Sequence, residues 1–187
     1  MSKRSAKRTL QVFCSNPRST RGVLRIGERV FPCAIGRSGM RASKREGDGA
    51  SPIGRHALLD VLYRADQVPR PRTGLPVKPL RRSDGWCDGA LDRNYNRPVR
   101  LPYEASHEEL WRADRLYDIV VVVDYNVRRR SRNLGSAIFM HVADPDYGPT
   151  AGCVALKLTH LQQVLAMLPR RTSLAIGRQD RVSSRSR

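Results

Sequence analysis

The stretch Gly135–Leu156, which reads GSAIFMHVADPDYGPTAGCVAL, determines how the rest of this chain is interpreted. Its first part, residues 136–142, is a short apolar run that predicts a buried strand carrying His141 near its end. Residues 144–149 are rich in turn-forming residues, so the backbone must loop there. A second apolar segment then contains Cys153, twelve residues after the histidine. We therefore expect two strand-like segments whose connecting loop brings the histidine and the cysteine close together.

The histidine and the cysteine allow more than one interpretation from their residue types alone. A thiol within hydrogen-bond reach of an imidazole is what a cysteine nucleophile and its base require, and Gly152 leaves room for a substrate beside Cys153. A lone cysteine, however, is usually a small buried hydrophobe. A zinc site through His141 and Cys153 would need remote ligands, because the four cysteines of the chain form no C-x-x-C pair. A disulfide among the other three cysteines, Cys14, Cys33 and Cys87, stays open.

The segment from His141 to Leu156 resembles the catalytic signature of the L,D-transpeptidase catalytic domain, the YkuD-like family, in which a histidine precedes an [S/T]-x-G-C motif. The short, single-domain branch of that family is the closer match. The similarity covers residues 8–177, between a basic tail at residues 1–7 and a basic tail at residues 178–187 that we expect to be disordered. Further family markers occur in the expected order: Gly47-Asp48-Gly49-Ala50-Ser51-Pro52-Ile53-Gly54, Gly85-Trp86-Cys87-Asp88, Tyr95-Asn96-Arg97, Leu110-Trp111-Arg112 and Tyr117-Asp118.

The resemblance implies a mostly β, single-domain, sandwich-like fold with one or two short helices. It also implies peptidoglycan L,D-transpeptidation, the reaction that cross-links cell-wall peptide stems. Cys153 would form a thioester with one stem, His141 would act as its base, and an amine of another stem would resolve the thioester. No metal or organic cofactor is required, and a covalent carbapenem adduct on Cys153 is expected.

Substrate contacts are expected around this pair. The amides near Gly152 and Cys153 are candidates to hold an oxyanion. Residues 128–132 form a basic loop next to the strand of His141, and arginine forks suit carboxylates. The expected oxyanion and substrate residues are therefore Gly152, Thr150, Tyr147, Arg130 and Arg132.

Two positions depart from the pattern of larger family members. Those proteins often carry a second histidine where this chain has Ala151, and an arginine or asparagine where it has Ala155. Neither position supplies the thiolate or its base. We expect the two alanines to change the choice of peptide stem rather than to remove the chemistry.

Two alternatives to a transpeptidase remain. The first is a hydrolase, an L,D-carboxypeptidase on the same stems, because one nucleophile and one base serve both reactions. The second is a non-catalytic basic protein that binds the cell wall or nucleic acid, since 35 Lys and Arg against 17 acidic residues give a net charge of +18. The basic residues are scattered and no nucleic-acid-binding signature is present, so we expect only non-specific nucleic-acid binding.

The start of the chain bears on where the protein works. Residues 1–8 are basic and lack the apolar run of a secretion signal, and no segment is apolar enough to span a membrane. The family resemblance implies the periplasm or the cell wall, while a cytoplasmic location stays open. We expect a monomer.

The remaining pattern predicts the secondary structure. A helix starting at Ser106 is suggested by a serine three residues before a glutamate, and a second capping box is formed by Thr159 and Gln162. That second helix should bury Leu161, Val164, Leu165 and Leu168. The other expectations are a strand at 9–14, a hairpin within 23–35, a long surface loop at 36–54, a strand at 56–63, mostly irregular chain at 67–102, a central buried strand at 119–123 beside 136–142, and a last strand at 172–176.

Overall fold

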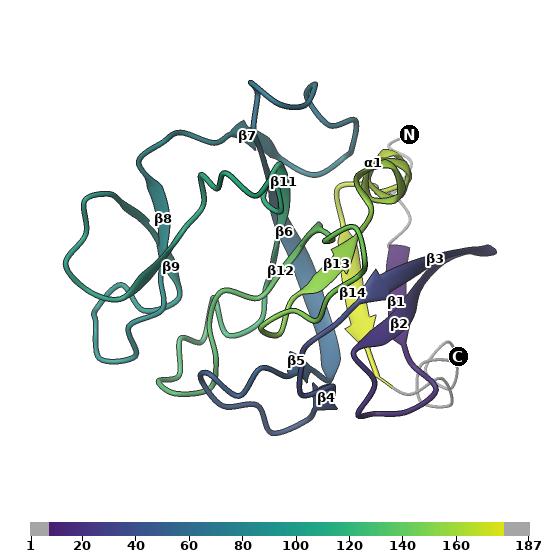
Figure 1. Cartoon of the computed structure of the whole chain (residues 1–187), viewed down its shortest axis with the longest axis horizontal. Helices are drawn as coiled ribbons and strands as arrows, with labels where there is room; N and C mark the ends of the chain where they lie inside the picture. Colours follow the sequence, from purple (N-terminus) through teal and green to yellow (C-terminus); the bar gives the residue numbers. More distant parts are fainter. Residues whose placement is uncertain (1–7, 178–187) are drawn as a thin grey trace, which may run out of the picture.

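Fourteen strands and one helix build residues 8–177, the part of the chain that this computed structural model describes (Figure 1). Predictions for residues 1–7 and 178–187 lie outside the described residues. The elements are β1 (Arg8–Phe13), β2 (Arg21–Ile26), β3 (Arg29–Ala34), β4 (Met40–Arg41), β5 (Ser51–Pro52), β6 (Gly54–Tyr63), β7 (Val77–Pro79), β8 (Asp84–Cys87), β9 (Arg97–Arg100), β10 (His107–Glu109), β11 (Ile119–Val123), β12 (Phe139–Val142), β13 (Val154–Leu156), α1 (Leu158–Ala166) and β14 (Thr172–Ile176).

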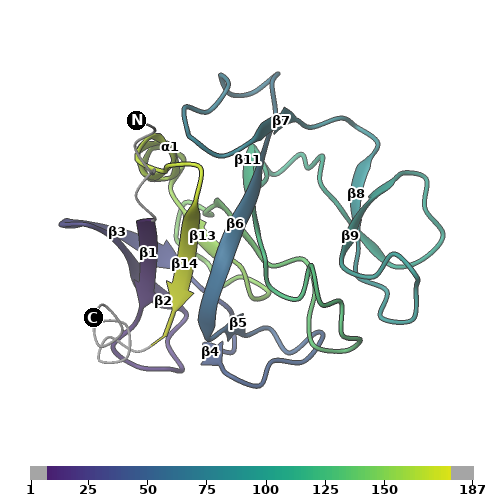
Figure 2. The same ribbon diagram turned by 180° about the vertical axis from the view of Figure 1, so that it is seen from behind.

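The main sheet has nine strands in the order β11-β12-β13-β3-β2-β1-β14-β6-β7. Strand β11 also pairs with β6, so the strand pairings from β11 round to β6 form a closed ring. The long strand β6 makes this closure possible. Its first part pairs with β14 and its second part with β11, and Figures 1 and 2 show it running along most of the height of the molecule. The mostly β, single-domain fold predicted from the sequence is confirmed, although the closure of the sheet was not predicted.

Strand β11 is buried along its whole length, which explains its run of five apolar residues. Successive side chains of a strand point to opposite faces, so a strand with two buried faces has no polar positions. Ile119, Val121 and Val123 pack into the larger core cluster, whereas Val120 and Val122 pack into a second cluster with Trp86 and Phe139 among others. As predicted, β11 pairs with β12. The second cluster also contains Cys153.

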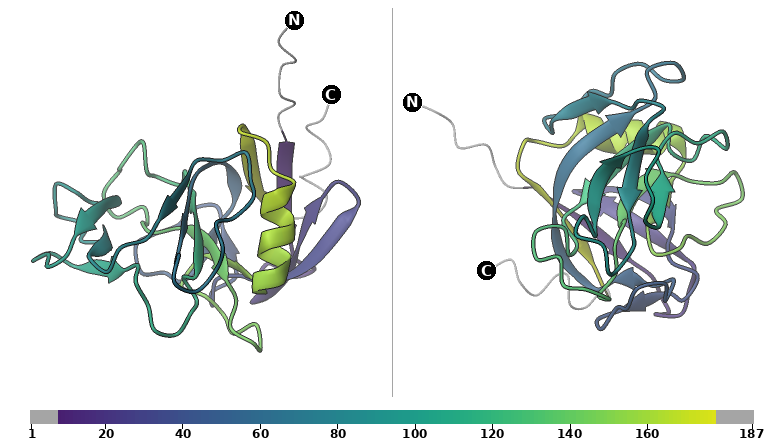
Figure 3. Two further views of the ribbon diagram at one scale, coloured as in Figure 1. Left: turned by 90° about the horizontal axis from the view of Figure 1, so that it is seen from above. Right: turned by 90° about the vertical axis from the view of Figure 1, so that its left-hand side faces the viewer.

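Helix α1 covers the larger core cluster at the end of the molecule away from β8–β10 (Figure 3). The predicted apolar face is confirmed for Leu161, Val164 and Leu165, which are buried, whereas Leu168 is buried but lies past the end of the helix at Ala166. The predicted capping box is wrong. The helix begins at Leu158 and its N-cap is Lys157, which makes no side-chain capping bond, so Thr159 already lies inside the first turn. Burial of the apolar face, not a cap, holds this short helix.

The predicted helix at Ser106 is wrong, because the residues that follow Ser106 form a strand of a separate three-stranded sheet, β10-β8-β9. Residues 107–109 form β10 because their backbone pairs with Gly85–Cys87 of β8. A local capping signal was overridden by pairing with a distant strand. Within residues 8–177, α1 is therefore the only helix. Figures 1 and 2 show the small sheet standing apart from the main sheet at one side of the molecule.

Two other predicted segments differ from the structure. The predicted surface loop at 36–54 contains two short strands, β4 and β5, and it folds back so that Ala50 and Ser51 are fully buried. The predicted strand at 136–142 begins only at Phe139, because Ala137 adopts a left-handed backbone conformation with φ of 50°. The predicted strands at 56–63 and 172–176 and the antiparallel start of the chain are confirmed.

Among residues 8–177, no helix is long and apolar enough to cross a membrane. Cys14, Cys33, Cys87 and Cys153 are all free cysteines.

Candidate active site

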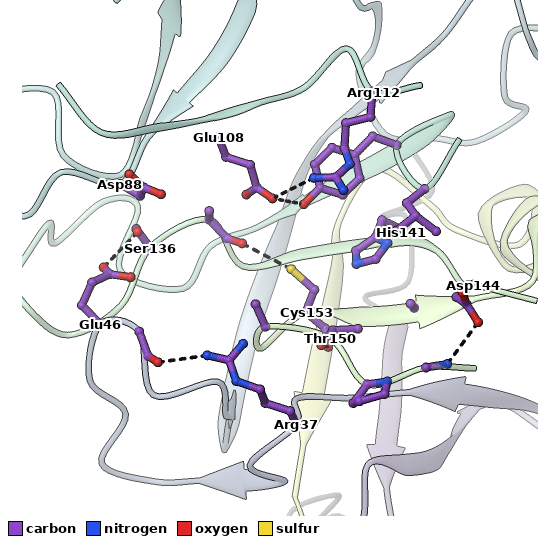
Figure 4. Close-up of a pocket in the computed structure, with 18 of the residues that line it drawn as sticks. Arg37, Glu46, Asp88, Glu108, Arg112, Ser136, His141, Asp144, Thr150 and Cys153 are labelled. Atoms are coloured by element: carbon purple, nitrogen blue, oxygen red, sulfur yellow. Dashed lines mark hydrogen bonds and ion pairs between the residues drawn. The ribbon is translucent and has the colours of Figure 1, made fainter. Parts of the chain in front are cut away.

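The candidate site is built on β12 and β13, which lie side by side as parallel strands. Met140 faces Val154 and His141 faces Ala155 in their register. Because side chains alternate along a strand, Cys153, which precedes Val154, points to the same face of the sheet as His141. Both side chains line one cavity of about 560 Å³, where Figure 4 shows them entering from neighbouring segments. The sequence-predicted pair therefore shares one cavity, although the hydrogen bonds of the Cys153 sulfur go to Ala137 and Phe139 and not to His141.

The imidazole of His141 is held in a defined orientation. Its Nδ1 lies 2.8 Å from the carbonyl oxygen of Val142. A carbonyl can only accept a hydrogen bond, so Nδ1 carries the proton and Nε2 keeps its lone pair. The Tyr117 ring packs against the imidazole in a T-shaped arrangement, with the ring centroids 5.2 Å apart. This is the tautomer that a general base needs, since Nε2 is ready to accept a proton.

The thiol of Cys153 lies between two backbone groups of the preceding segment. It donates to the carbonyl oxygen of Ala137 at 3.3 Å, and its sulfur accepts from the backbone N–H of Phe139 at 3.3 Å. The side chain is only 6 % exposed. The Phe139 amide favours a negative sulfur, whereas the Ala137 carbonyl favours the protonated thiol.

Both groups are electrically neutral in the resting site. Burial, with a smaller contribution from the Glu108 carboxylate, raises the pKa of the Cys153 thiol to about 12, against the opposing effects of the Phe139 amide and the Lys44 ammonium. Burial also lowers the pKa of His141 to about 4, despite its hydrogen bond to Val142. The resting pair is thus a thiol beside a neutral imidazole, and ionisation must be coupled to substrate binding.

The neutral, buried state of His141 predicts how stability depends on pH. Between its ordinary pKa of 6.5 and its folded value of about 4, the unfolded chain binds a proton that the folded protein does not. Stability should therefore be fully present above the ordinary value and fall by about 3 kcal/mol as the pH drops through this window. Urea unfolding of wild type and His141→Asn, at about pH 7 and about pH 4, measures the difference. An equal loss in both proteins would show that His141 does not cause it.

Gly152 is required by a close backbone approach. Its φ is +136°, and a Cβ atom there would lie 2.8 Å from the carbonyl oxygen of Ala50. The fully buried Ser51 donates from its hydroxyl to the Gly152 carbonyl at 2.8 Å and accepts from the Gly36 amide at 3.0 Å. Two of the sequence markers, at residues 47–54 and 150–153, are therefore in direct contact, and together they fix the backbone that carries Cys153.

Thr150 supports the same backbone from the other side. Its hydroxyl donates to the Cys153 carbonyl at 2.8 Å and accepts from the Gly152 amide at 3.1 Å. The Gly152 amide is thus already hydrogen-bonded and does not point freely at a substrate carbonyl. Thr150 lines the cavity, and these two bonds hold the turn before the nucleophile in place.

The other predicted substrate residues lie farther from the pair. Arg130 and Arg132 are exposed and do not line the cavity, so the predicted carboxylate contact has no support from their positions. Tyr147 does not line the cavity either, and its ring packs beside the buried Ala155 instead. Ala151 is exposed at the cavity rim. The predicted effects of Ala151 and Ala155 on the choice of peptide stem stay predictions.

Several charged groups of the cavity were not assigned a role from the sequence. Glu108 lies 4.0 Å from a guanidinium nitrogen of Arg112 and accepts a hydrogen bond from the Tyr117 hydroxyl. Burial raises the pKa of the Glu108 carboxyl. Trp111, next to Arg112, has the guanidinium of Arg64 over its ring at 3.7 Å, and Arg64 also donates to the Arg112 carbonyl at 2.7 Å. The marker at residues 110–112 is thereby anchored so that Arg112 lines the cavity.

The opposite wall is contributed by the segment after β4. Lys44 is buried and paired with Asp48 at 2.7 Å, and Glu46 accepts from the Ser136 hydroxyl at 2.9 Å. Figure 4 shows Glu46, Ser136 and Asp88 together on one side of the cavity, Arg112 above His141 and next to Glu108, and Arg37 below Cys153. The cavity therefore carries acidic and basic groups on more than one wall: Lys44 lies on the same segment as Glu46, and Arg112 lies beside Glu108. From the sequence, only the order of the family markers indicated that the segments carrying these charged residues belong to the site.

Within the described residues 8–177, no group of three or more His, Cys, Asp or Glu side chains is placed to hold a metal ion.

Comparisons with known proteins place this arrangement in context. A family model for the L,D-transpeptidase catalytic domain, YkuD, matches residues 11–176. A search of curated protein sequences finds no match. Among solved structures, the chain is similar to the crystal structure of Mycobacterium tuberculosis L,D-transpeptidase 1, with 10 % sequence identity and a TM-score of 0.40. That alignment covers 90 % of this chain and 58 % of the mycobacterial chain.

Proposed function

The chain belongs to the L,D-transpeptidase catalytic-domain family, and from this premise we propose that it is a peptidoglycan L,D-transpeptidase with Cys153 as its nucleophile and His141 as its base. The observation that carries the proposal is the pairing of a buried thiol and a neutral imidazole on one face of β12 and β13, in a single cavity. Each side chain has a fixed orientation through backbone hydrogen bonds.

The first half of the reaction forms a thioester. The sulfur of Cys153 attacks the carbonyl carbon at an L-centre of the donor stem while its proton passes to Nε2 of His141. The carbonyl oxygen gains negative charge, and the Cys153 amide is the donor proposed to stabilise it, because the Gly152 amide already donates to Thr150. The carbon–nitrogen bond to the following D-residue then breaks, and His141 returns the proton to the departing amine. The products are the acyl-enzyme and a free D-amino acid.

The second half transfers the acyl group. The amine of a second stem attacks the thioester carbonyl, His141 accepts the amine's proton, and the sulfur leaves and regains a proton. One amide bond is broken and one is formed, so no external reductant, oxidant or cofactor enters the balance. If water replaces the amine, the same steps give an L,D-carboxypeptidase.

The charges of the cavity suit two differently charged partners. Arg112 and Arg37 line the cavity. Asp114 holds two nitrogens of the Arg112 guanidinium and the Gly47 carbonyl accepts from Arg37, which leaves the remaining N–H groups to meet a stem carboxylate. Glu46, Asp88 and the partly buried Glu108 line it as carboxyl groups that favour a cationic amine. We propose that a carboxylate of the donor stem meets Arg112, which lies near His141, and that the acceptor amine enters over Glu46 and Asp88.

A single chain supplies both reacting groups, so the proposal needs no second copy. Because its substrates are peptidoglycan stems, we place the activity at the cell wall or in the periplasm. The positive net charge of +18 favours retention on a polyanionic wall surface.

Mass spectrometry of the protein incubated with purified muropeptides tests the proposed reaction. A cross-linked dimer together with a released D-amino acid is the expected result. Trimmed stems without dimers would replace the transpeptidase by the carboxypeptidase. Binding to sacculi without any change in mass would overturn both and leave a non-catalytic wall-binding protein.

A further inference from the structure

Ala137 has an unusual backbone conformation directly beside the nucleophile. Its φ is 50°, in the left-handed region that residues other than glycine seldom occupy. It lies two residues before β12 and lines the cavity. Its carbonyl oxygen is the acceptor of the Cys153 thiol at 3.3 Å. Something must hold Ala137 in this strained conformation, because the free chain would leave it.

Asn96 is the group that holds it. Its Oδ1 accepts from the Ala137 amide at 3.1 Å and from the Trp86 indole N–H at 2.9 Å, and its Nδ2 donates to the Tyr125 carbonyl at 3.1 Å. Both partners of Oδ1 are pure donors, which fixes the orientation of the side-chain amide. Asn96 is fully buried and itself left-handed, with φ of 57°. Asparagine tolerates that conformation better than most residues.

Trp86 links Asn96 to Phe139, whose amide is the second backbone group that contacts the sulfur. It is buried, and the edge of its ring meets Phe139 at a centroid distance of 5.2 Å. Phe139 provides the amide that donates to the Cys153 sulfur. Both backbone groups that contact the thiol are thus supported by the Trp86–Asn96 pair, which comes from β8 and the turn before β9 in the small sheet.

We propose that Asn96 is a positioning residue for the nucleophile: by fixing Ala137, it points a carbonyl at the thiol and keeps the resting Cys153 protonated and turned away from His141. The inference rests on the proposed role of Cys153. Substrate entering the cavity would displace the thiol from this carbonyl and release its proton to Nε2 of His141. In the free protein, the same contact shields the thiol from unwanted electrophiles.

Removing the Asn96 acceptor has a specific consequence. Ala137 loses its amide partner, leaves the left-handed conformation and turns its carbonyl away from the sulfur. A thiolate is no longer opposed by a carbonyl lone pair, whereas the Phe139 amide still stabilises it. The thiol should then ionise more readily and react faster with a small alkylating agent, although it is less well aligned for turnover.

The experiment follows the alkylation of Cys153 by iodoacetamide as a function of pH, with the labelled peptide quantified by mass spectrometry. Asn96→Gly removes the acceptor while tolerating the left-handed backbone. It should label about tenfold faster than wild type near neutral pH, with its pH profile shifted down by about one unit. Asn96→Asp retains an acceptor for Trp86 and Ala137 and should label no faster than wild type.

Asn126→Gly is the matched control. Asn126 has φ of 56° and its side chain also makes three hydrogen bonds, but they go to Ser131 and Gly135 and none goes to Ala137. An equal acceleration of Cys153 alkylation in Asn126→Gly would mean that a general loosening of the fold causes it, and this would overturn the inference. So would an unchanged pH profile in Asn96→Gly.

Trp86→Phe provides a second route if Asn96→Gly does not fold. It removes one donor from Asn96 Oδ1 while an aromatic ring remains against Phe139, and it should accelerate labelling in the same direction by about threefold. An unchanged rate in a folded Trp86→Phe protein would contradict the inference. Because alkylation needs no peptidoglycan, a failed muropeptide assay would leave this result interpretable, and the reverse also holds.

Discussion

Cys153→Ala is expected to abolish the formation of any new muropeptide species, with a loss of turnover on the order of 10⁴-fold or more. The physical reason is that the methyl group cannot form the thioester through which the acyl group passes. The protein should still fold. A sulfur atom is lost next to the cavity, and the Ala137 carbonyl and Phe139 amide lose a partner, which together cost about 1–3 kcal/mol.

Cys87→Ala is the matched control for this experiment. Cys87 is also a free, buried cysteine, but it lies in β8 and does not line the cavity. It should retain turnover within a few-fold of wild type while losing a similar amount of stability. Product formation that survives in Cys153→Ala, or a comparable loss in Cys87→Ala, would identify the wrong nucleophile. Muropeptide mass spectrometry and thermal unfolding of both variants supply the two measurements.

The features that the sequence predicted well are those with strong local patterns. The run Ile119–Val123 is short and entirely β-branched, which predicts a strand buried on both faces, and the helical spacing of Leu161, Val164 and Leu165 predicts a helix with one buried face. The same holds for the last strand, Thr172–Ile176. In each case, hydrophobic burial dominates the energy, so the local pattern and the final structure agree.

The features that were not predicted from the sequence depend on contacts between distant segments. Residues 107–109 form a strand only because β8 lies beside them, and Ala137 is left-handed only because Asn96 holds its amide. No local propensity encodes either result. The walls of the cavity belong to the same class, since Glu108 and Lys44 come from segments far from Cys153 in the chain. The order of the family markers indicated that these segments matter, but not which atoms they place where.

His141→Asn is expected to slow the acylation of Cys153 by a carbapenem by about 10²- to 10⁴-fold near neutral pH. This replacement is chosen because the asparagine Nδ2 can take the place of the histidine Nδ1, which lies 2.8 Å from the Val142 carbonyl. The hydrogen bond is retained, while the basic Nε2 is removed. The nucleophile and the rest of the cavity remain in place, so the loss measures the base alone.

The pH dependence distinguishes loss of a base from a general disturbance of the site. In wild type, burial lowers the pKa of His141 to about 4, so the imidazole is already a competent base at about pH 6 and the acylation rate should change little up to about pH 8. In His141→Asn, only the rare thiolate reacts, and burial raises the pKa of Cys153 to about 12. The rate of the variant should therefore rise about tenfold per pH unit over the same range, because the thiolate fraction does. Intact-protein mass spectrometry at several pH values follows the adduct. A variant with a flat profile and a wild-type rate would show that His141 does not take the thiol proton, and the base would then have to be sought among the other groups that face Cys153, with Glu108 the first to replace.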